Sequence, residues 1–299
     1  PRELMPVVEE ICRWTTLPVA VKPNAGLPDP NTNLYNVTPD EFAEAAAKFS
    51  HLGVKILGGC CGTSPEYIKA LTEKLSTEHF VPRTVNIPSA VCSYANTSVI
   101  DQPRIIGERI NPTGKKRFKE ALKNNDINYI LGQAIEQAGA GADILDVNVG
   151  LPDIDEKAMM VKTVKALQGV TDLPLQIDST IPEVIEAALR VYNGKAIVNS
   201  VNGEEKSLET ILPIVKKYGA AVVGLALDEN GIPKKAEQRF EIAKKIMNRA
   251  MSMGIPKQDI FIDCLTLTAS AEQEGVMETV NALYRVKHEL GLKTVLGVS

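Results

Sequence analysis

Two groups of residues in the 299-residue sequence have the types and spacing that metal or ligand chemistry requires. The first is the pair Cys60 and Cys61, which lies between glycines in the run GGCCGT at residues 58–63. Adjacent thiols in a chain with five cysteines indicate metal or redox chemistry in a reducing compartment rather than a disulfide scaffold. A zinc site needs three or four protein ligands, so a third ligand must come from elsewhere. The alternative is that both thiols pack as small hydrophobic side chains.

The second group consists of acids and carboxamides that follow short apolar runs. A carboxylate accepts hydrogen bonds and a carboxamide both donates and accepts them, so such a set could hold a flat ligand with donors and acceptors along one edge. For a single Asp or Asn at the end of a strand, the alternative role is that of a helix N-cap. Ser179 or Thr180 could also cap a helix that has Pro182 in its first turn. The candidate binding residues are Glu108, Asn111, Asp146, Asn148, Asp178, Asn199 and Asp263.

The elements that must position these residues alternate along the chain. From residue 104 onward, short runs rich in β-branched residues are followed by polar turns and then by longer segments with helical periodicity. The runs are almost continuously apolar, as expected of parallel strands that are buried on both faces. The predicted strands cover residues 104–110, 142–147, 174–177, 195–198, 220–226, 259–262 and 293–298, and the predicted helices cover residues 127–138, 156–167, 181–191, 208–218, 235–253 and 271–290.

Polar residues at the ends of most of these strands favour a closed parallel sheet over an open one. An open sheet gathers its ligand groups at one switch point and usually carries a glycine-rich phosphate loop. Neither GxGxxG after the first strand nor GxxxxGK[ST] anywhere occurs in the sequence. A (β/α)₈ TIM barrel instead collects ligand groups from the whole ring of strands at its C-terminal mouth. We therefore predict an α/β fold with a TIM barrel, of which the sequence supplies about seven of eight strands.

The N-terminal part of the chain predicts a smaller set of elements of the same kind. They are helices at residues 3–14, 39–52 and 65–75 and strands at residues 19–22 and 54–57. Two βα units are too few for a barrel. We expect the C-terminal piece of one barrel (residues 1–77), a proline-containing linker (78–102) and most of a second barrel (103–299) that lacks its last βα unit, all within a longer polypeptide. Thr38 and Glu41 predict a capping box at the start of the second helix.

Composition limits the class of protein. The formal net charge is −4 and the sequence pI is about 5.6, which argues against a general nucleic-acid binder. Hydrophobic residues make up 44% of the chain, and no apolar run approaches the roughly 20 residues that span a bilayer. No basic and apolar leader opens the sequence. We therefore expect a cytoplasmic α/β enzyme, or part of one, with no nucleic-acid or membrane partner.

Several runs resemble methyltransferase families. GGCCGT at residues 58–63, with KPNAG at residues 22–26, resembles the end of the zinc-dependent homocysteine S-methyltransferase domain. Four further runs resemble the pterin-binding barrel of methyltetrahydrofolate methyltransferases. The two modules occur in this order in the cobalamin-dependent methionine synthase family, and the resemblance covers essentially the whole chain. The four runs are GERINPTG (107–114), DVN (146–148), IDST (177–180) and VNSVNG (198–203).

The resemblance implies a metal site in the first part of the chain. The family holds zinc with three cysteine thiolates, and Cys60 and Cys61 match two of them. The third belongs to an earlier strand that is absent from this sequence. Zinc would bind the sulfur of homocysteine in its fourth position, and a metal-bound thiol loses its proton readily.

The resemblance also implies a pterin site in the second barrel. It implies that Asp146, Asp178 and Asn199 hold the pterin. Asp263 and Asn148 would complete the polar floor of the pocket. Glu108 and Asn111 would shape the same pocket.

The reaction that the resemblance implies has two methyl transfers. The N5 methyl group of 5-methyltetrahydrofolate passes to cob(I)alamin and then, through the zinc module, from methylcobalamin to homocysteine, which gives methionine. The cobalamin-binding domain would be separate, either in the same longer chain or in trans. Because an amine anion is a poor leaving group, N5 must gain a proton or a strong hydrogen bond. The family assigns part of this task to an Asn that would here be the residue after Ser299.

Three alternatives stay open at this point. A methyltransferase that serves a corrinoid iron–sulfur protein shares the second barrel but lacks the Gly-Gly-Cys-Cys module. Dihydropteroate synthase is a related pterin enzyme, but the sequence shows no cradle for a pyrophosphate. The chain could also be a catalytically inert fragment that binds folate or metal.

Overall fold

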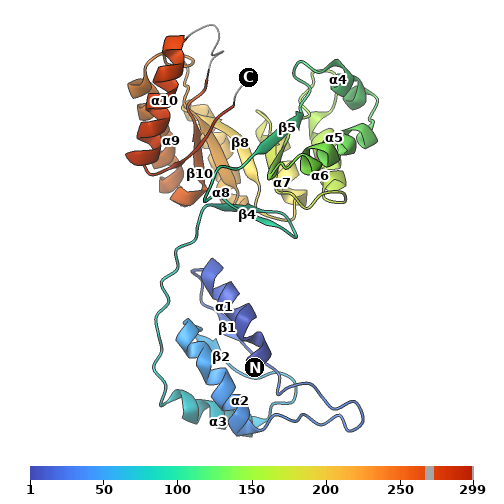
Figure 1. The fold of residues 1–299 in the computed structure, drawn as a ribbon, viewed down its shortest axis with the longest axis vertical. Coiled ribbons are helices and arrows are strands. Elements are labelled where there is room, and N and C mark those ends of the chain that lie inside the picture. The colour runs from blue at the N-terminus through green and yellow to red at the C-terminus, as the bar shows by residue number, and fades with distance from the viewer. Residues whose placement is uncertain (267–272, 298–299) are drawn as a thin grey trace. The chain divides into compact units, whose positions relative to one another are not determined.

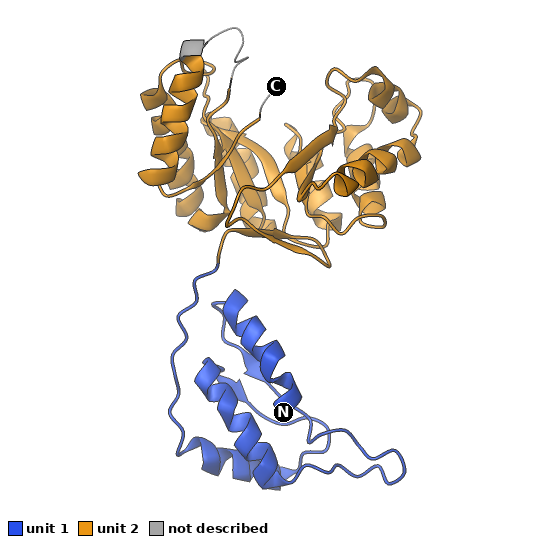
Figure 2. Cartoon of the chain, in the orientation of Figure 1, with its two compact units in different colours: residues 1–87 blue, residues 88–299 orange. Residues whose placement is uncertain are grey.

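The structure, a computed structural model, describes residues 1–266 and 273–297. The chain divides into two compact units, unit 1 (Pro1–Ile87) and unit 2 (Pro88–Ser299), which Figure 2 shows in different colours. Each unit has an apolar core of its own, so each is described by itself. Among the helices that the structure describes, none is long and apolar enough to cross a membrane.

Unit 1 consists of helices and two short parallel strands. Ala20 of the first strand pairs with Ile56 of the second. Its elements are α1 (Met5–Trp14), β1 (Ala20–Val21), α2 (Pro39–Ala47), β2 (Ile56–Leu57) and α3 (Pro65–Leu75), with 3₁₀ turns at Arg2–Leu4 and Lys48–Leu52.

Helix α2 organises the core of unit 1. Glu41 N donates a hydrogen bond to Thr38 Oγ1, and Thr38 N donates to the Glu41 carboxylate at 3.0 Å, so the predicted capping box is confirmed. The helix buries Phe42 completely and packs against α3. It ends earlier than predicted because Lys48–Leu52 continues as a 3₁₀ turn, which closes at Gly53 with φ 74°.

Unit 2 begins with an antiparallel hairpin and continues with strands that alternate with helices. The hairpin consists of β3 (Ala90–Cys92) and β4 (Thr97–Val99), inside the segment predicted to be a linker. The strands that follow are β5 (Ile106–Ile110), β6 (Ile144–Val147), β7 (Leu175–Asp178), β8 (Ile197–Asn202), β9 (Ala221–Leu225), β10 (Ile260–Asp263) and β11 (Lys293–Val295). The helices are α4 (Lys116–Lys123), α5 (Ile127–Gly139), α6 (Glu156–Leu167), α7 (Pro182–Val191), α8 (Glu205–Tyr218), α9 (Ala236–Ser252) and α10 (Gln273–His288), with a 3₁₀ turn at Lys257–Asp259.

The seven strands from β5 to β11 form one parallel sheet in sequence order. Figure 1 shows the sheet curled, with the helices around its outside. Within the described residues, no hydrogen-bonded pairing closes β11 onto β5. The predicted α/β fold is therefore confirmed, and the sheet is a partial barrel with seven strands.

Side chains alternate between the two faces of this sheet, as the period of two in a strand requires. On β6, Leu145 and Val147 belong to the core between the sheet and the helices, whereas Ile144 and Asp146 face the inside of the curl. Near the amino ends of the strands, apolar inner residues pack around Val91 of the hairpin. The inner face is thus apolar at one end and polar at the carboxyl ends of the strands.

The predicted bounds differ from the observed ones mainly at the ends of elements. The strand predicted at residues 142–147 begins at Ile144. The strand predicted at residues 293–298 is observed as β11, and its last residue, Val298, lies outside the described residues, as does Ser299. The first two residues of the helix predicted at 271–290 also lie outside them.

Candidate functional site

The curled sheet of unit 2 encloses a cavity of about 820 Å³, a size typical of small-molecule sites. Its apolar wall comes from the inner face of the sheet and includes Ile144, Ile197 and Phe261. Six of the seven predicted binding residues line it, and Asn148, the seventh, is bonded to one of the six. The six lining residues are Glu108, Asn111, Asp146, Asp178, Asn199 and Asp263.

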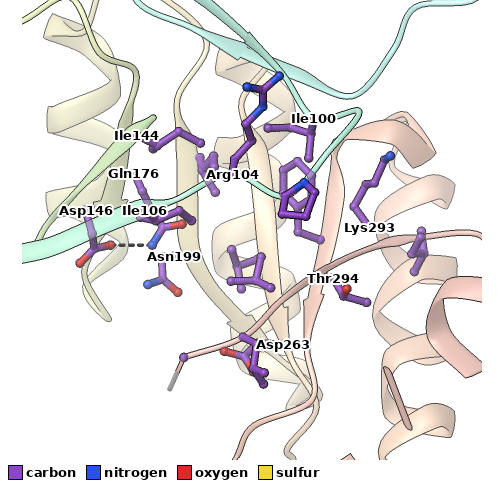
Figure 3. Close-up of a pocket in the computed structure, with 18 of the residues that line it drawn as sticks. Ile100, Arg104, Ile106, Ile144, Asp146, Gln176, Asn199, Asp263, Lys293 and Thr294 are labelled. Carbon is purple, nitrogen blue, oxygen red and sulfur yellow. Dashed lines mark hydrogen bonds between the residues drawn. The ribbon is translucent and has the colours of Figure 1, made fainter. Parts of the chain in front are cut away.

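Asp146 on β6 is the most deeply buried acid of this set, with an exposed fraction of 2%. Gln176 Nε2 donates a hydrogen bond to Asp146 Oδ1 at 2.6 Å, as Figure 3 shows. Burial raises the pKa of Asp146 to about 7, and the nearby Asp178 carboxylate adds to the rise, while the amides of Gln176 and Asn199 oppose it. Because this acid titrates near neutral pH, it can offer a ligand either a carboxylate or a carboxylic acid.

Asp178 at the end of β7 is held by a neighbouring carboxamide. Asn148 Nδ2 donates to Asp178 Oδ2 at 2.9 Å, and Asn148 Oδ1 accepts from Gly150 N at 2.9 Å. The two bonds fix which way the amide faces. Burial raises the pKa of Asp178, and the charges of Glu108 and Glu156 raise it further, against the effect of the Asn148 hydrogen bond.

Asn199 and Asp263 extend the polar rim to two further strands. Asn199 of β8 pairs in register with Asp178, and Figure 3 shows its side chain next to that of Asp146. Asp263 ends β10, and its Oδ1 accepts a hydrogen bond from Leu265 N at 2.7 Å. Burial raises the pKa of Asp263, and this backbone hydrogen bond opposes the rise.

Glu108 and Asn111 lie at the end of β5. Lys115 Nζ donates to the backbone carbonyl of Glu108 at 2.9 Å and to its carboxylate at 3.1 Å. Asn111 is buried, and its Oδ1 accepts from Thr113 N at 2.8 Å. This bond leaves the Asn111 amino group as the end of the side chain that can donate to a ligand.

Helix caps in unit 2 come from other residues. Asp126 caps α5 and Asp155 caps α6 through side-chain hydrogen bonds. The alternative in which Ser179 or Thr180 caps α7 is not observed, because α7 has no side-chain cap. Ser179 Oγ instead donates to Glu156 Oε1 at 2.6 Å. The acids and carboxamides at the strand ends therefore line the cavity rather than cap helices.

Gln176, which is not among the residues predicted from the sequence, also lines the cavity. It lies two positions before Asp178 in β7, so the alternation of strand side chains places both residues on the inner face. The sequence could have indicated this position, because Gln176 is a polar residue in an otherwise apolar strand and is separated by two positions from a candidate acid.

The two adjacent cysteines lie in the loop after β2 of unit 1. Both are exposed, and their Sγ atoms are 3.9 Å apart. Cys61 N donates to Asn24 Oδ1 at 3.1 Å, which ties this loop to the KPNAG segment. The turn requires glycine at position 62, because φ is 78° there and an added Cβ would lie 2.3 Å from the Tyr35 ring.

The spacing of the two sulfurs fits a shared zinc ion. Two Zn–S bonds of about 2.3 Å at a tetrahedral angle place the sulfurs roughly 3.8 Å apart. Cys60 and Cys61 therefore fit two corners of a tetrahedral site. Among the residues that the structure describes, no group of three His, Cys, Asp or Glu side chains could hold a metal ion.

Two family models match the chain in the order that its motifs suggest. Residues 1–75, which include the cysteine pair, match the model described as homocysteine S-methyltransferase. Residues 107–299 match the model described as pterin binding enzyme.

Curated relatives align with the whole of this chain. It is 34% identical over 321 residues to the methionine synthase of Mycobacterium leprae (strain TN) and 33% identical over 316 residues to that of Mycobacterium tuberculosis (strain ATCC 25618 / H37Rv). Both alignments cover 100% of this chain, but only 27% and 26% of the relatives. The chain thus spans about a quarter of the length of these proteins.

Solved structures share the fold of unit 2. Dihydropteroate synthase from Xanthomonas albilineans, solved with 4-aminobenzoic acid, has a TM-score of 0.56 and 19% identity, over 71% of this chain and 77% of that chain. The enzyme from Stenotrophomonas maltophilia has a TM-score of 0.54 and 19% identity, over 70% of this chain and 77% of that chain. At this identity the likeness shows the fold alone. Since the second family match runs from β5 to the end of the chain and contains all seven predicted binding residues, the chain belongs to the pterin-binding enzyme family.

Proposed function

We propose that the chain is the homocysteine- and folate-binding part of a cobalamin-dependent methionine synthase. The enzyme moves the N5 methyl group of 5-methyltetrahydrofolate, by way of cobalamin, to homocysteine. The order of the two family matches supports this proposal, as does the identity to methionine synthases along the whole chain. Cobalamin is bound by a separate domain, in the same longer chain or in trans. All five cysteines lie among the described residues and are unpaired, which supports a reducing compartment such as the cytoplasm.

The observation that carries the proposal is the convergence of carboxylates and carboxamides on one cavity. A reduced pterin has N–H donors and carbonyl or ring-nitrogen acceptors along a flat edge. Asp178, Asn199 and Asp263 lie on three strands around the cavity and supply partners of both kinds. The apolar inner face of the sheet supplies the surface on which the faces of the ring pack.

The polar residues of the cavity bind and orient the ring. Asn148 holds Asp178 by one hydrogen bond, and Gln176 holds Asp146 by another, so both acids have a fixed direction before the ligand arrives. Cobalamin, when bound, supplies the nucleophile that accepts the methyl group. N5 needs a proton or a strong hydrogen bond before the methyl group leaves.

The cysteine loop of unit 1 serves the second methyl transfer. Cys60 and Cys61 would supply two ligands of a tetrahedral zinc ion, and such a site needs at least one further protein ligand. Zinc, when bound, lowers the pKa of the homocysteine thiol and so supplies a thiolate near neutral pH. The exposure of both cysteines leaves room for this substrate.

The other candidates explain less of the chain. A methyltransferase for a corrinoid iron–sulfur protein accounts for unit 2 but not for the cysteine loop. The likeness to dihydropteroate synthase concerns the fold alone. An inert fragment would bind folate without transferring its methyl group.

Calorimetric titration of the chain with 5-methyltetrahydrofolate tests the proposal. We expect the wild-type chain to bind. Asp178→Ala should weaken binding by about 1.5–3 kcal/mol, the worth of a hydrogen bond to a charged group, and Asn199→Ala by about 0.5–1.5 kcal/mol, the worth of a neutral one. Asp153→Ala is the matched control, since Asp153 is exposed and pairs with Lys123 outside the cavity.

Unchanged affinity in both cavity variants would refute the site. Methyl transfer from 5-methyltetrahydrofolate to added cobalamin separates the enzyme from the inert fragment, which would retain binding without transfer.

A further inference from the structure

Gln176 occupies the cavity wall directly beside the acids. It precedes Asp178 by two positions on β7 and pairs in register with Asp146 on one side and with Ile197 on the other. Its side chain is 5% exposed, so solvent cannot satisfy its polar atoms. Figure 3 shows the hydrogen bond between its amide and Asp146, with the side chain of Asn199 drawn below them in this view.

The two ends of the Gln176 carboxamide have different surroundings. Nε2 donates to Asp146 Oδ1 at 2.6 Å. In its carboxylate form Asp146 only accepts hydrogen bonds, so in that form the amino group of the Gln176 carboxamide faces it. The remaining atom, Oε1, is buried and has no hydrogen-bond partner among the residues that the structure describes.

An unpaired buried acceptor is unusual, because more than nine in ten buried polar groups have a partner. Leaving such a group unsatisfied costs free energy, which is recovered when a donor arrives. Gln176 lines the same cavity as Asp178 and Asn199. The group that Oε1 lacks is an N–H or O–H donor.

We infer that Gln176 is a specificity-determining residue of the folate site, whose Oε1 accepts a hydrogen bond from a ring N–H that only a reduced pterin carries. The inference rests on the proposed function. A tetrahydropterin has an N–H at position 8, where the fully oxidised ring has a bare nitrogen. That nitrogen is an acceptor and would face the Gln176 oxygen without a proton between them. A site built to accept from an N–H rejects the analogue that lacks it.

Binding of two ligands to matched variants tests this inference. The ligands are 5-methyltetrahydrofolate and folic acid, which has the oxidised ring. Gln176→Met keeps the length of the side chain but removes its acceptor. We expect it to weaken binding of both ligands, because Asp146 loses its hydrogen bond from Gln176, and to weaken binding of 5-methyltetrahydrofolate by about tenfold more than binding of folic acid. The preference for the reduced ligand therefore falls.

The control and the second variant keep the test decisive. Gln168→Met removes hydrogen bonds to Val164 O and Val191 O outside the cavity, and it should leave both affinities unchanged. If Gln176→Met does not fold, as judged by circular dichroism, Gln176→Leu provides the same comparison.

Each outcome is decisive. Equal weakening of both ligands, or no weakening of either, in a chain whose wild type binds 5-methyltetrahydrofolate would overturn the role of Gln176 alone. Failure of the wild-type chain to bind 5-methyltetrahydrofolate would overturn the proposed function and this inference with it.

Discussion

The two candidate sites of the molecule are built in opposite ways. In unit 2 the candidate binding side chains lie in or just after strands, all but Glu108 are buried or half-buried, and they hold one another through the pairs Gln176–Asp146 and Asn148–Asp178. In unit 1 the functional side chains lie on a loop and are exposed, and the loop is held through its backbone. Hydrogen bonds between side chains fix the positions of the first set of residues, and the backbone of a turn fixes the positions of the second set.

This difference follows from what each ligand needs. A flat ring with several donors and acceptors is selected by many fixed polar groups, which must be buried to exclude water. Burying acids has a cost to the fold, visible in the raised pKa values of Asp146, Asp178 and Asp263. A metal ion is held by a few strong bonds, so its ligands can stay exposed while a turn sets their spacing. The comparison implies that substitutions in one site leave the other unaffected.

The largest effect that tests this separation is the loss of metal binding. We expect Cys60→Ser with Cys61→Ser to lower the zinc affinity of the chain by about a hundredfold or more, because both thiolate ligands disappear. Competition against a colorimetric zinc chelator measures it, and folate binding should not change. Cys92→Ser, in unit 2, is the thiol control. Unchanged zinc affinity in the double variant would show that Cys60 and Cys61 are not zinc ligands.

Much of the candidate site in unit 2 could be predicted from the sequence, because it depends on local features. Asp146 is the second-to-last residue of β6 and Asp178 is the last residue of β7, and the carboxyl ends of parallel strands meet at one edge. A correct assignment of the strands and helices therefore places both acids at the same edge of the sheet. The capping box at Thr38 was predictable for the same reason, since all its atoms lie within one turn.

The features that the sequence did not reveal depend on distant contacts. The hairpin β3–β4 forms because Cys92 N donates to Lys195 O and Ser89 Oγ donates to Gln258 O, contacts that join residues far apart in the chain. Nothing in the sequence around Gln176 shows which residue its side chain contacts. Its role depends on the register with Asp146 in the neighbouring strand.

An effect of similar size should show that the turn of unit 1 is sterically fixed, unlike an ordinary turn. Gly62→Ala meets both a positive φ of 78° and a Cβ position 2.3 Å from the Tyr35 ring. We expect it to destabilise unit 1 by about 3 kcal/mol, from left-handed backbone strain and steric overlap together. Gly219→Ala is the matched control. Its φ is 65°, but nothing lies within 4 Å of the added Cβ, so about 1 kcal/mol is expected.

Chemical denaturation of the two glycine variants measures these losses. Equal losses at both positions would mean that Tyr35 moves aside and that the cysteine turn is not sterically fixed.

The cost of burying acids in unit 2 predicts a pH-dependent gain from Asp146→Asn. The folded pKa of Asp146 is about 7 against 3.8 for an ordinary Asp, so between about pH 4 and pH 7 the unfolded chain releases a proton that the folded chain keeps. The stability of the wild type therefore falls as the pH rises through this range, and the Asn variant lacks that loss. We expect the variant without ligand to be more stable by on the order of 2 kcal/mol at pH 8, with little difference at pH 4.

Urea unfolding of both proteins at pH 4 and pH 8 checks this expectation. Asp153→Asn, at an exposed position, should show no such gain. A variant that is less stable than wild type at pH 8 would mean that the Asp146 carboxylate stabilises the fold, and the contrast with the exposed site of unit 1 would weaken.

The smallest effect tests whether the two units unfold separately. Thr38→Ala removes the side-chain cap of α2 in unit 1, and Asp155→Ala removes that of α6 in unit 2. Each should cost about 1 kcal/mol, because one hydrogen bond to an otherwise unpaired helix N–H is lost. In differential scanning calorimetry, each substitution should move a different transition to lower temperature, since the two units have separate cores. If either substitution moves both transitions equally, the two units unfold cooperatively. Separate cores would then not be enough to make the two sites independent.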